Sequence, residues 1–276
     1  MKKVIASVVA VGCLAAAGSA LAGMPAATGV NGSLHDMTKV APATADKMGR
    51  VCVYCHAPHH AMKDGLDNYP LWNHNLVDPT TYTGYTWATP ANADAAGTVI
   101  VNPLIGPSRL CMSCHDGAIA IDQHGDAANN GTMWQAGSTT VAARAKLTND
   151  LSNTHPIGFD YNAIATARNA AAGNGSATAN GASEIVPSTF GFATGITEST
   201  VAGTYNTVTR GTVGDGTVFK PIKDTLYQGT YMTCATCHEV HNKENATQDT
   251  INGLTPNYFL YAKENKSLIC LSCHVK

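Results

Sequence analysis

Cys52-Val53-Tyr54-Cys55-His56 is a Cys-x-x-Cys-His frame, in which two thiols stand three residues apart and a histidine follows directly. The same frame recurs as Cys111-Met112-Ser113-Cys114-His115, Cys234-Ala235-Thr236-Cys237-His238 and Cys270-Leu271-Ser272-Cys273-His274. A chain with this content of cysteine and histidine would contain on the order of 0.01 such frames by chance. Four of them indicate one chemistry used four times. We number these frames 1 to 4 in chain order.

The spacing suits the covalent attachment of haem. Two thiols three residues apart reach the two vinyl groups of one haem and form thioethers, and the adjacent histidine then lies under the iron as its proximal ligand. We therefore expect four covalently bound haem c groups. The expected thioether cysteines are Cys52, Cys55, Cys111, Cys114, Cys234, Cys237, Cys270 and Cys273, and the expected proximal ligands are His56, His115, His238 and His274.

Paired cysteines have two other common uses. Disulfides form in exported proteins, and two Cys-x-x-Cys units can bind one zinc ion. Neither use needs a histidine after every second cysteine. Of the nine cysteines, only Cys13 lies outside the frames, and haem accounts for all the others.

The chain has more histidines than the frames need. Eleven are present, and those outside the frames are His35, His59, His60, His74, His124, His155 and His241. Several are expected to supply the second axial ligand of an iron. With histidines to spare, methionine ligation is not required, and Met62, Met112, Met133 and Met232 are better explained as packing against porphyrin.

His59 and His241 each follow a proximal histidine by three residues, which gives Cys-x-x-Cys-His-x-x-His in frames 1 and 3. A histidine so close to a proximal ligand cannot easily bend back to its own iron. We expect each to reach the iron of a neighbouring haem, so that two haems approach closely.

The other distal candidates stand in different surroundings. His155 precedes Pro156, which holds the backbone extended, and apolar residues follow it; an ordinary surface histidine is the alternative. His35 lies near the N-terminus of the processed chain, where it could fold back or reach another copy. His74 is a reserve distal candidate, whereas His60 and His124 are better explained as solvated groups or as partners of ligands.

The N-terminus has the pattern of a secretory signal peptide over residues 1–22. Lys2 and Lys3 precede a short apolar run, and the segment ends in small residues at Ala22. A lipoprotein cleavage before Cys13 is the alternative. No later stretch approaches the roughly 18 apolar residues of a transmembrane helix. We expect an exported protein, extracellular or at the cell surface, with the periplasm as the alternative.

Composition and motif order predict the organisation of the chain. A formal charge of −2 argues against nucleic acid as a partner. Residues 23–125 form a first di-haem unit, residues 126–225 an Ala/Gly/Thr-rich connecting region that carries His155, and residues 226–276 a second di-haem unit. The expected fold class is a multihaem cytochrome c with little regular secondary structure: short helices at the haem motifs, loops, a few short strands near 204–209 and 217–219, one helix near 164–172, and the haem stack as core.

These motifs together resemble a known family. Cys52 to His59 reads Cys-Val-Tyr-Cys-His-Ala-Pro-His; Pro-Leu-Trp-Asn, Leu-Cys-Met-Ser-Cys-His-Asp-Gly and His-Pro-Ile-Gly-Phe follow, and then a second Cys-His-x-x-His and a C-terminal Leu-Cys-x-x-Cys-His. The sequence resembles the doubled Cys-x-x-Cys-His cytochromes, and most of all the OmcE-like tetrahaem c-type cytochromes of metal-reducing bacteria, which form extracellular filaments. The resemblance covers nearly all of the chain after the signal peptide, except the connecting region.

The resemblance implies bis-histidine ligation of every haem, with His35, His59, His155 and His241 as distal ligands. In filament-forming members one such histidine crosses to the adjacent subunit, and the haems stack into a continuous wire. We favour His35 for that role because it lies near a free end. Family members often carry Arg where this chain has His74, which leaves open whether His74 displaces one of the four.

The leading functional hypothesis is an electron-transfer protein without enzymatic activity, which conducts electrons outside the cell as a homopolymer. Its expected partners are further copies of itself, other multihaem cytochromes, and extracellular metal oxides or other terminal acceptors. A monomeric periplasmic shuttle needs the same haems and no contact between copies. A multihaem reductase would need an iron with an open coordination position, and the supply of distal histidines does not require one.

Overall fold

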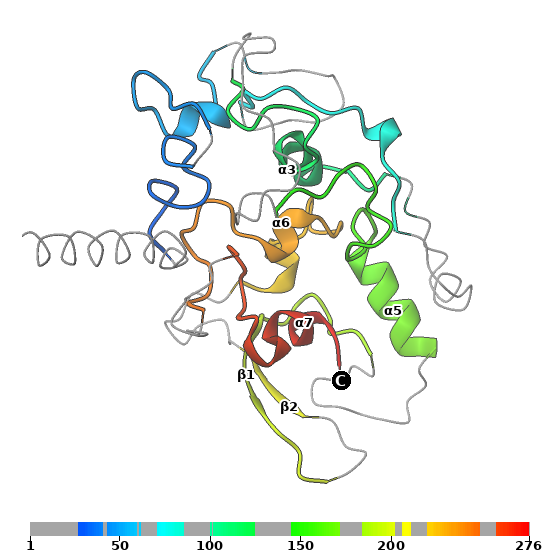
Figure 1. Cartoon of the computed structure of the whole chain (residues 1–276). Helices are drawn as coiled ribbons and strands as arrows, with labels where there is room; N and C mark the ends of the chain where they lie inside the picture. Colours follow the sequence, from blue (N-terminus) through cyan, green and yellow to red (C-terminus); the bar gives the residue numbers. More distant parts are fainter. Residues whose placement is uncertain are drawn as a thin grey trace, which may run out of the picture.

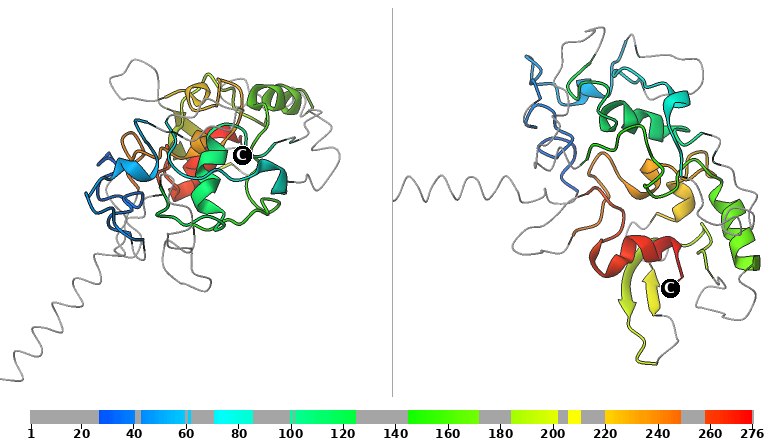
Figure 2. Two further views of the ribbon diagram at one scale, coloured as in Figure 1. Left: turned by 90° about the horizontal axis from the view of Figure 1, so that it is seen from above. Right: turned by 45° about the vertical axis from the view of Figure 1, so that its right-hand side comes forward.

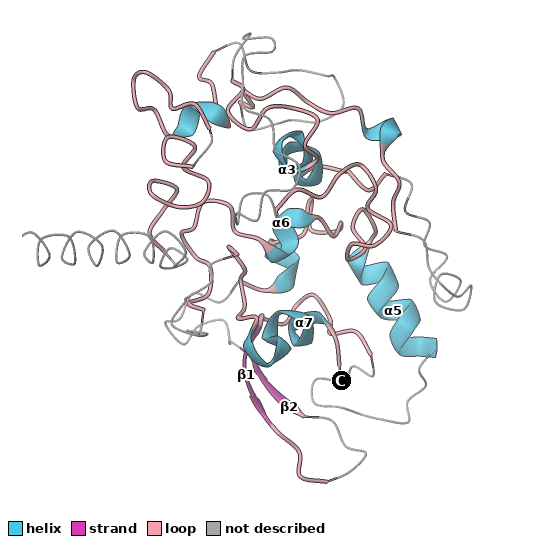
Figure 3. Ribbon diagram, viewed as in Figure 1, coloured by secondary structure: helices cyan, strands magenta, loops and turns pink. Residues whose placement is uncertain are grey.

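The computed structural model describes residues 27–40, 43–59, 61, 71–85, 100, 102–124, 145–171, 184–201, 206–210, 220–248 and 258–275. The expected signal peptide, its Cys13, the expected strand at 217–219, and His60, Met62 and Met133 lie outside these ranges. Most of the described chain is loop and turn (Figure 3). No helix within the described ranges is long and apolar enough to cross a membrane.

Short helices coincide with the cysteine frames. Frame 1 lies on the 3-10 turn η1 (Cys52–Tyr54), frame 2 on α3 (Pro107–His115), frame 3 on α6 (Cys234–Cys237) and frame 4 on α7 (Leu268–Cys273). One helical turn places residues i and i+3 on the same face, so each turn presents its two thiols side by side. Further 3-10 turns are η2 (Pro79–Thr81), η3 (Ile222–Asp224) and η4 (Asn265–Ser267).

Local sequence explains where these helices begin. Pro107 occupies the first turn of α3, where its missing N–H costs nothing. The Thr236 hydroxyl accepts a hydrogen bond from the Thr233 N–H at the start of α6, at 2.9 Å. Beyond α6 and α7 the backbone becomes extended at His238 and His274. His238 and His274 therefore project from the ends of their helices.

The remaining regular structure lies in the connecting region. α5 (Tyr161–Ala171) begins where the Asp160 carboxylate accepts a hydrogen bond from the Ala163 N–H at 2.9 Å. It overlaps the helix expected near 164–172. β1 (Ala193–Thr197) pairs antiparallel with β2 (Thr207–Arg210), which overlaps the expected strand near 204–209.

Frames 2, 3 and 4 form a column. α3, α6 and α7 follow one another down the molecule in Figure 1, and the turned view on the right of Figure 2 keeps the same order. Frame 1 lies beside the α3 end of the column, and the β1–β2 pair lies against α7. The Ala193 N–H donates to the Ser272 hydroxyl at 2.9 Å, which joins β1 to α7.

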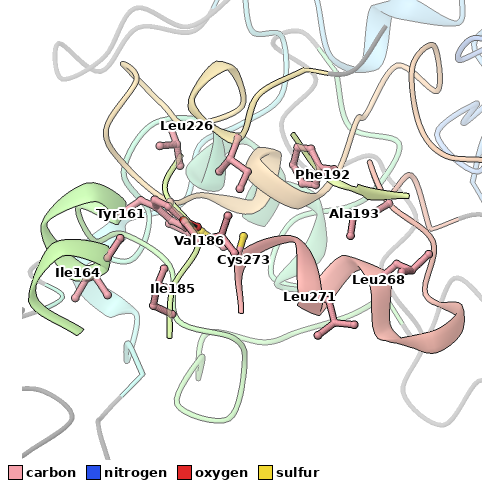
Figure 4. Packing of buried hydrophobic residues seen from close by; sticks show 14 of the residues in the cluster. Tyr161, Ile164, Ile185, Val186, Phe192, Ala193, Leu226, Leu268, Leu271 and Cys273 are labelled. Atoms are coloured by element: carbon pink, nitrogen blue, oxygen red, sulfur yellow. Dashed lines mark hydrogen bonds between the residues drawn. The ribbon is translucent and has the colours of Figure 1, made fainter. Parts of the chain in front are cut away.

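The larger cluster of buried side chains surrounds frame 4. Tyr161, Val186 and Cys273 lie together in Figure 4, and the Tyr161 hydroxyl donates to the Val186 carbonyl at 2.7 Å. Met232 belongs to this cluster, whereas Met112 lies in a second cluster with Val77, Leu104 and Leu151. Both methionines are thus packed among apolar side chains, beside frames 3 and 2.

Candidate functional site

Three pairs of histidine rings, which we call the facing pairs, lie across similar gaps, with ring planes 13° apart for His56 and His241, 70° for His35 and His115, and 66° for His155 and His274. The ring centroids of His56 and His241, of His35 and His115, and of His155 and His274 are each 6.3 Å apart. A metal–imidazole bond is about 2 Å long, and about 1 Å more separates each nitrogen from its ring centre, so two imidazoles that bind one ion from opposite sides have centroids about 6 Å apart. The spacing of all three pairs suits an iron between them.

Distance alone does not select these pairs, because the Trp72 ring also lies 6.3 Å from the His56 ring. Composition does. Each facing pair joins one frame histidine to one histidine outside the frames. That is the combination that one proximal and one distal ligand require.

Hydrogen bonds at Nδ1 orient several of these rings. A backbone carbonyl can only accept, so a ring nitrogen that faces one must carry the proton and donate, which leaves Nε2 with the lone pair that binds a metal. Four site histidines have this arrangement: His35 Nδ1 with Val240 O at 3.1 Å, His115 with Ala145 O at 2.8 Å, His155 with Pro156 O at 3.0 Å, and His238 with Tyr258 O at 2.7 Å.

Glu239 shapes the turn that positions His241. Its buried carboxylate accepts from the backbone N–H groups of His241 at 3.0 Å, of Glu244 at 3.1 Å, and of Lys243. His241 Nδ1 lies 3.6 Å from the same carboxylate. The turn after frame 3 thereby directs the His241 ring towards frame 1, where it faces His56 with the ring planes 13° apart.

Burial favours the neutral form of three site imidazoles. It lowers the pKa of His35 to about 4, against the opposing effect of the hydrogen bond to Val240. It also lowers the pKa of His115 and of His238. A neutral imidazole is the form that coordinates a metal, so these rings are ready to bind at neutral pH.

All eight frame cysteines are free thiols. Burial raises the pKa of Cys55 to about 11 and of Cys237 to about 12, which keeps both protonated. Among the described residues, no group of three or more His, Cys, Asp or Glu side chains is arranged to hold one metal ion. Opposed imidazole pairs next to thiol pairs are the arrangement that haem c would need.

The thiols also give the order of the frames in space. The Cys111 and Cys234 thiols hydrogen-bond each other, which joins frame 2 to frame 3. Cys55 is near enough to raise the pKa of Cys114, which joins frame 1 to frame 2. Cys273 likewise raises the pKa of Cys237, which joins frame 3 to frame 4. The frames therefore follow one another in the order 1, 2, 3, 4.

His238 is the proximal candidate without a facing ring. Within the described ranges, no imidazole is stacked against it or opposes it. His59, a predicted distal ligand, is exposed and faces no frame histidine in the described part of the chain. His35 faces His115 of its own chain, which argues against our sequence-based preference for His35 as the histidine donated to another copy.

His74 is not a member of the three facing pairs. Its ring is fully buried, with Nε2 2.9 Å from Ala120 O and Nδ1 3.2 Å from Asn75 O. A neutral ring can donate from only one nitrogen, and the placement of both beside carbonyl oxygens favours a structural role for His74 over the reserve assignment as a ligand. His124 contacts Tyr54 edge-on, and its Nε2 lies 3.7 Å from the Asp46 carboxylate.

Two residues that the sequence does not single out, Phe259 and Arg210, help to hold the candidate site in place. Phe259 stacks on His35 at 4.4 Å with the rings nearly parallel. Arg210 on β2 donates to the carbonyls of Ser272 at 2.7 Å and Leu271 at 2.6 Å, at the C-terminal end of α7. These contacts join segments far apart in sequence, so no local sequence pattern predicts them.

A comparison with protein-family models found no match for this chain, and a comparison with curated proteins found none either. The assignment below therefore depends on the residues and their geometry.

Proposed function

We propose that this chain is an exported tetrahaem c-type cytochrome that conducts electrons along closely spaced bis-histidine haems and joins end to end with further copies. Bound haem would supply an iron that accepts and releases one electron reversibly. The observation that carries the proposal is the set of three facing pairs, His56 with His241, His35 with His115, and His155 with His274.

The facing pairs favour electron transfer over catalysis. An imidazole on each side would leave a bound iron without an open coordination position, and chemistry on a small oxidant needs one. The hydrogen bonds at Nδ1 and the burial of the rings fix the ligands in place. A ligand set that does not move suits an iron that changes charge without binding a substrate.

The contacts between frames support a conducting row. Thiols of consecutive frames approach each other from frame 1 to frame 4. Because thioethers lie at haem edges, neighbouring thiols bring neighbouring haem edges together. The exposed thiols Cys52 and Cys270 belong to the first and last frames, which favours those frames as the places where electrons enter and leave.

His59 and His238 support assembly. His238 has its Nδ1 held by the Tyr258 carbonyl and its Nε2 left for a metal. The described chain offers it no facing imidazole, and His59 is the one predicted distal ligand without a partner there. We propose that His59 of a second copy completes the iron site at His238. The donor and acceptor surfaces differ, so each copy can donate His59 to one neighbour and receive His59 from another, which builds a filament.

Electron microscopy and spectroscopy of three variants test this proposal. Wild-type protein should form filaments with four low-spin haems per chain. The variant His59→Ala should keep four haems yet yield single particles with one iron open to carbon monoxide or added imidazole. His35→Ala should open one iron without preventing filaments, and His124→Ala is the matched control that changes neither property.

Single wild-type particles with every iron low-spin would reject the filament and favour the monomeric shuttle. Rapid carbon monoxide binding to the reduced wild-type filament would favour a reductase. Colourless wild-type protein would reject the haem assignment altogether.

A further inference from the structure

Trp72 presents a buried indole N–H without an acceptor. The side chain is 8% exposed, and Nε1 has no hydrogen-bond partner in the described part of the chain. Buried polar groups in folded proteins are nearly always hydrogen-bonded, because an unpaired one costs free energy. An unpaired donor at this depth therefore points to an acceptor that the polypeptide does not supply.

Backbone hydrogen bonds fix this indole beside frame 1. The Ala57 N–H donates to Leu71 O at 2.8 Å, and the Asn73 N–H donates to Cys55 O at 2.9 Å. Trp72 itself pairs with His56 across this short antiparallel bridge. The segment from Leu71 to Asn73 is thus held along frame 1 on both sides of the tryptophan.

The ring geometry places Trp72 next to one particular iron site. Its ring lies 6.3 Å from the His56 ring at an interplanar angle of 88°. His56 is the proximal candidate of frame 1, so the haem that Cys52 and Cys55 would carry would lie beside the Trp72 ring. His74, the other ring nearby at 6.4 Å, has both nitrogens directed at backbone carbonyls.

Haem c offers one kind of strong hydrogen-bond acceptor for the indole N–H. Its vinyl groups are consumed by the thioethers, and its remaining polar substituents are the propionate carboxylates. We propose that the Trp72 indole N–H donates a hydrogen bond to a propionate of the haem attached to Cys52 and Cys55. This inference rests on the proposed function, and it assigns Trp72 as a positioning residue that tunes the reduction potential of that haem.

The hydrogen bond has a predictable electrostatic effect. An N–H donor withdraws charge from the carboxylate and so weakens its stabilisation of the oxidised, more positive iron. Removing the donor should lower the reduction potential of that haem. It should also raise the pKa of the propionate, so that the pH dependence of the potential moves to higher pH.

The variant Trp72→Phe tests this effect in the haem-loaded protein. Phenylalanine keeps an aromatic ring against His56 and lacks the N–H. In a potentiometric titration followed by visible absorption, one of the four potentials should fall while the others stay unchanged. Thr225→Val is the matched control: it removes a buried hydroxyl outside the frames whose acceptor is the Ile222 carbonyl, so all potentials should remain at their wild-type values.

A second measurement needs only the difference between wild type and this variant. Ultraviolet resonance Raman spectra report the hydrogen bonding and deuteration of indole N–H groups in single particles or filaments. The band lost in Trp72→Phe should be that of a hydrogen-bonded indole that exchanges slowly in D2O. Unchanged potentials at full haem loading, or a non-bonded and rapidly exchanging Trp72 N–H, would overturn this inference alone. A wild-type mass without haem would instead reject the proposed function.

Discussion

The ring centroids of His56 and His241 are 6.3 Å apart and the ring planes are 13° from parallel, although His56 belongs to the first Cys-x-x-Cys-His frame and His241 follows the third. Sequence predicted that His241 serves a neighbouring iron because it stands too near His238 to serve the same one. In the structure, the frame histidine beside His241 is His56 of frame 1. This pairing ties frame 1 to the turn after frame 3, and the site depends on it.

Replacing His241 should therefore affect the iron at frame 1. In His241→Ala we expect four haems per chain and one iron that loses its low-spin signal in electron paramagnetic resonance. His241→Met should restore a six-coordinate iron with a higher reduction potential than in wild type. A wild-type spectrum in His241→Ala would contradict the pairing, and His124→Ala provides the comparison because its ring faces no frame histidine within the described ranges.

Gly158 holds the loop that carries His155. Its φ of +85° suits glycine, and a Cβ there would collide with the backbone of Asn102. Gly158→Ala should lower the free energy of unfolding by about 2 kcal/mol or more and disturb the axial ligation at His274.

The control is Gly49→Ala, where φ is also positive but a Cβ would meet open space. It should cost about 1 kcal/mol and leave every low-spin signal intact. Denaturant unfolding and electron paramagnetic resonance measure the two effects. Equal losses of unfolding free energy and of low-spin signal in both variants would contradict a special role for the loop that carries His155.

Arg210 should stabilise frame 4 from the strand pair. Its guanidinium donates to three backbone carbonyls, of Leu271, Ser272 and Gly191. Arg210→Met removes these bonds and should cost about 2–4 kcal/mol, with lower haem loading at Cys270 and Cys273 measured by peptide mass spectrometry.

Arg50→Met is the matched control, because Arg50 forms an exposed ion pair with Asp46 at i−4. Such pairs contribute about 0.5 kcal/mol. Haem loading should remain complete at every frame. A similar small loss in Arg210→Met would show that the strand pair does not support frame 4.

His74→Gln should separate a structural histidine from a ligand. We expect a loss of about 1–3 kcal/mol in unfolding free energy, because buried carbonyls lose their partner, with all low-spin signals retained. Burial lowers the pKa of His74, so the unfolded chain takes up a proton below about pH 6.5 while the folded chain resists it.

Wild-type stability should consequently fall as pH drops below about 6.5, and the variant should lack that component of the fall. Denaturant unfolding at pH 7.5 and pH 5.5 measures the difference. Loss of a low-spin signal in His74→Gln would instead return His74 to the list of ligands.

The parts of the site that sequence predicts are those encoded by local spacing. A Cys-x-x-Cys-His frame needs one helical turn, and the helices or 3-10 turns at Cys52, Cys111, Cys234 and Cys270 follow from that requirement. Pro156 restrains His155, which faces His274.

The parts that sequence could not predict depend on contacts between distant segments. A position near the N-terminus suggested that His35 could reach another copy, but Val240 and Phe259 hold it within its own chain. An abundance of histidines suggested His74 as a reserve ligand, and only the fold brings the Ala120 carbonyl to its Nε2.

The most direct test of the account is an electron cryo-microscopy map of the purified, secreted protein at a resolution that shows side chains. It should show a porphyrin joined to Cys52 and Cys55, with its iron bound between Nε2 of His56 and Nε2 of His241. A map in which the space between these rings holds no porphyrin, or in which the His241 ring turns away from the iron, would contradict the central claim.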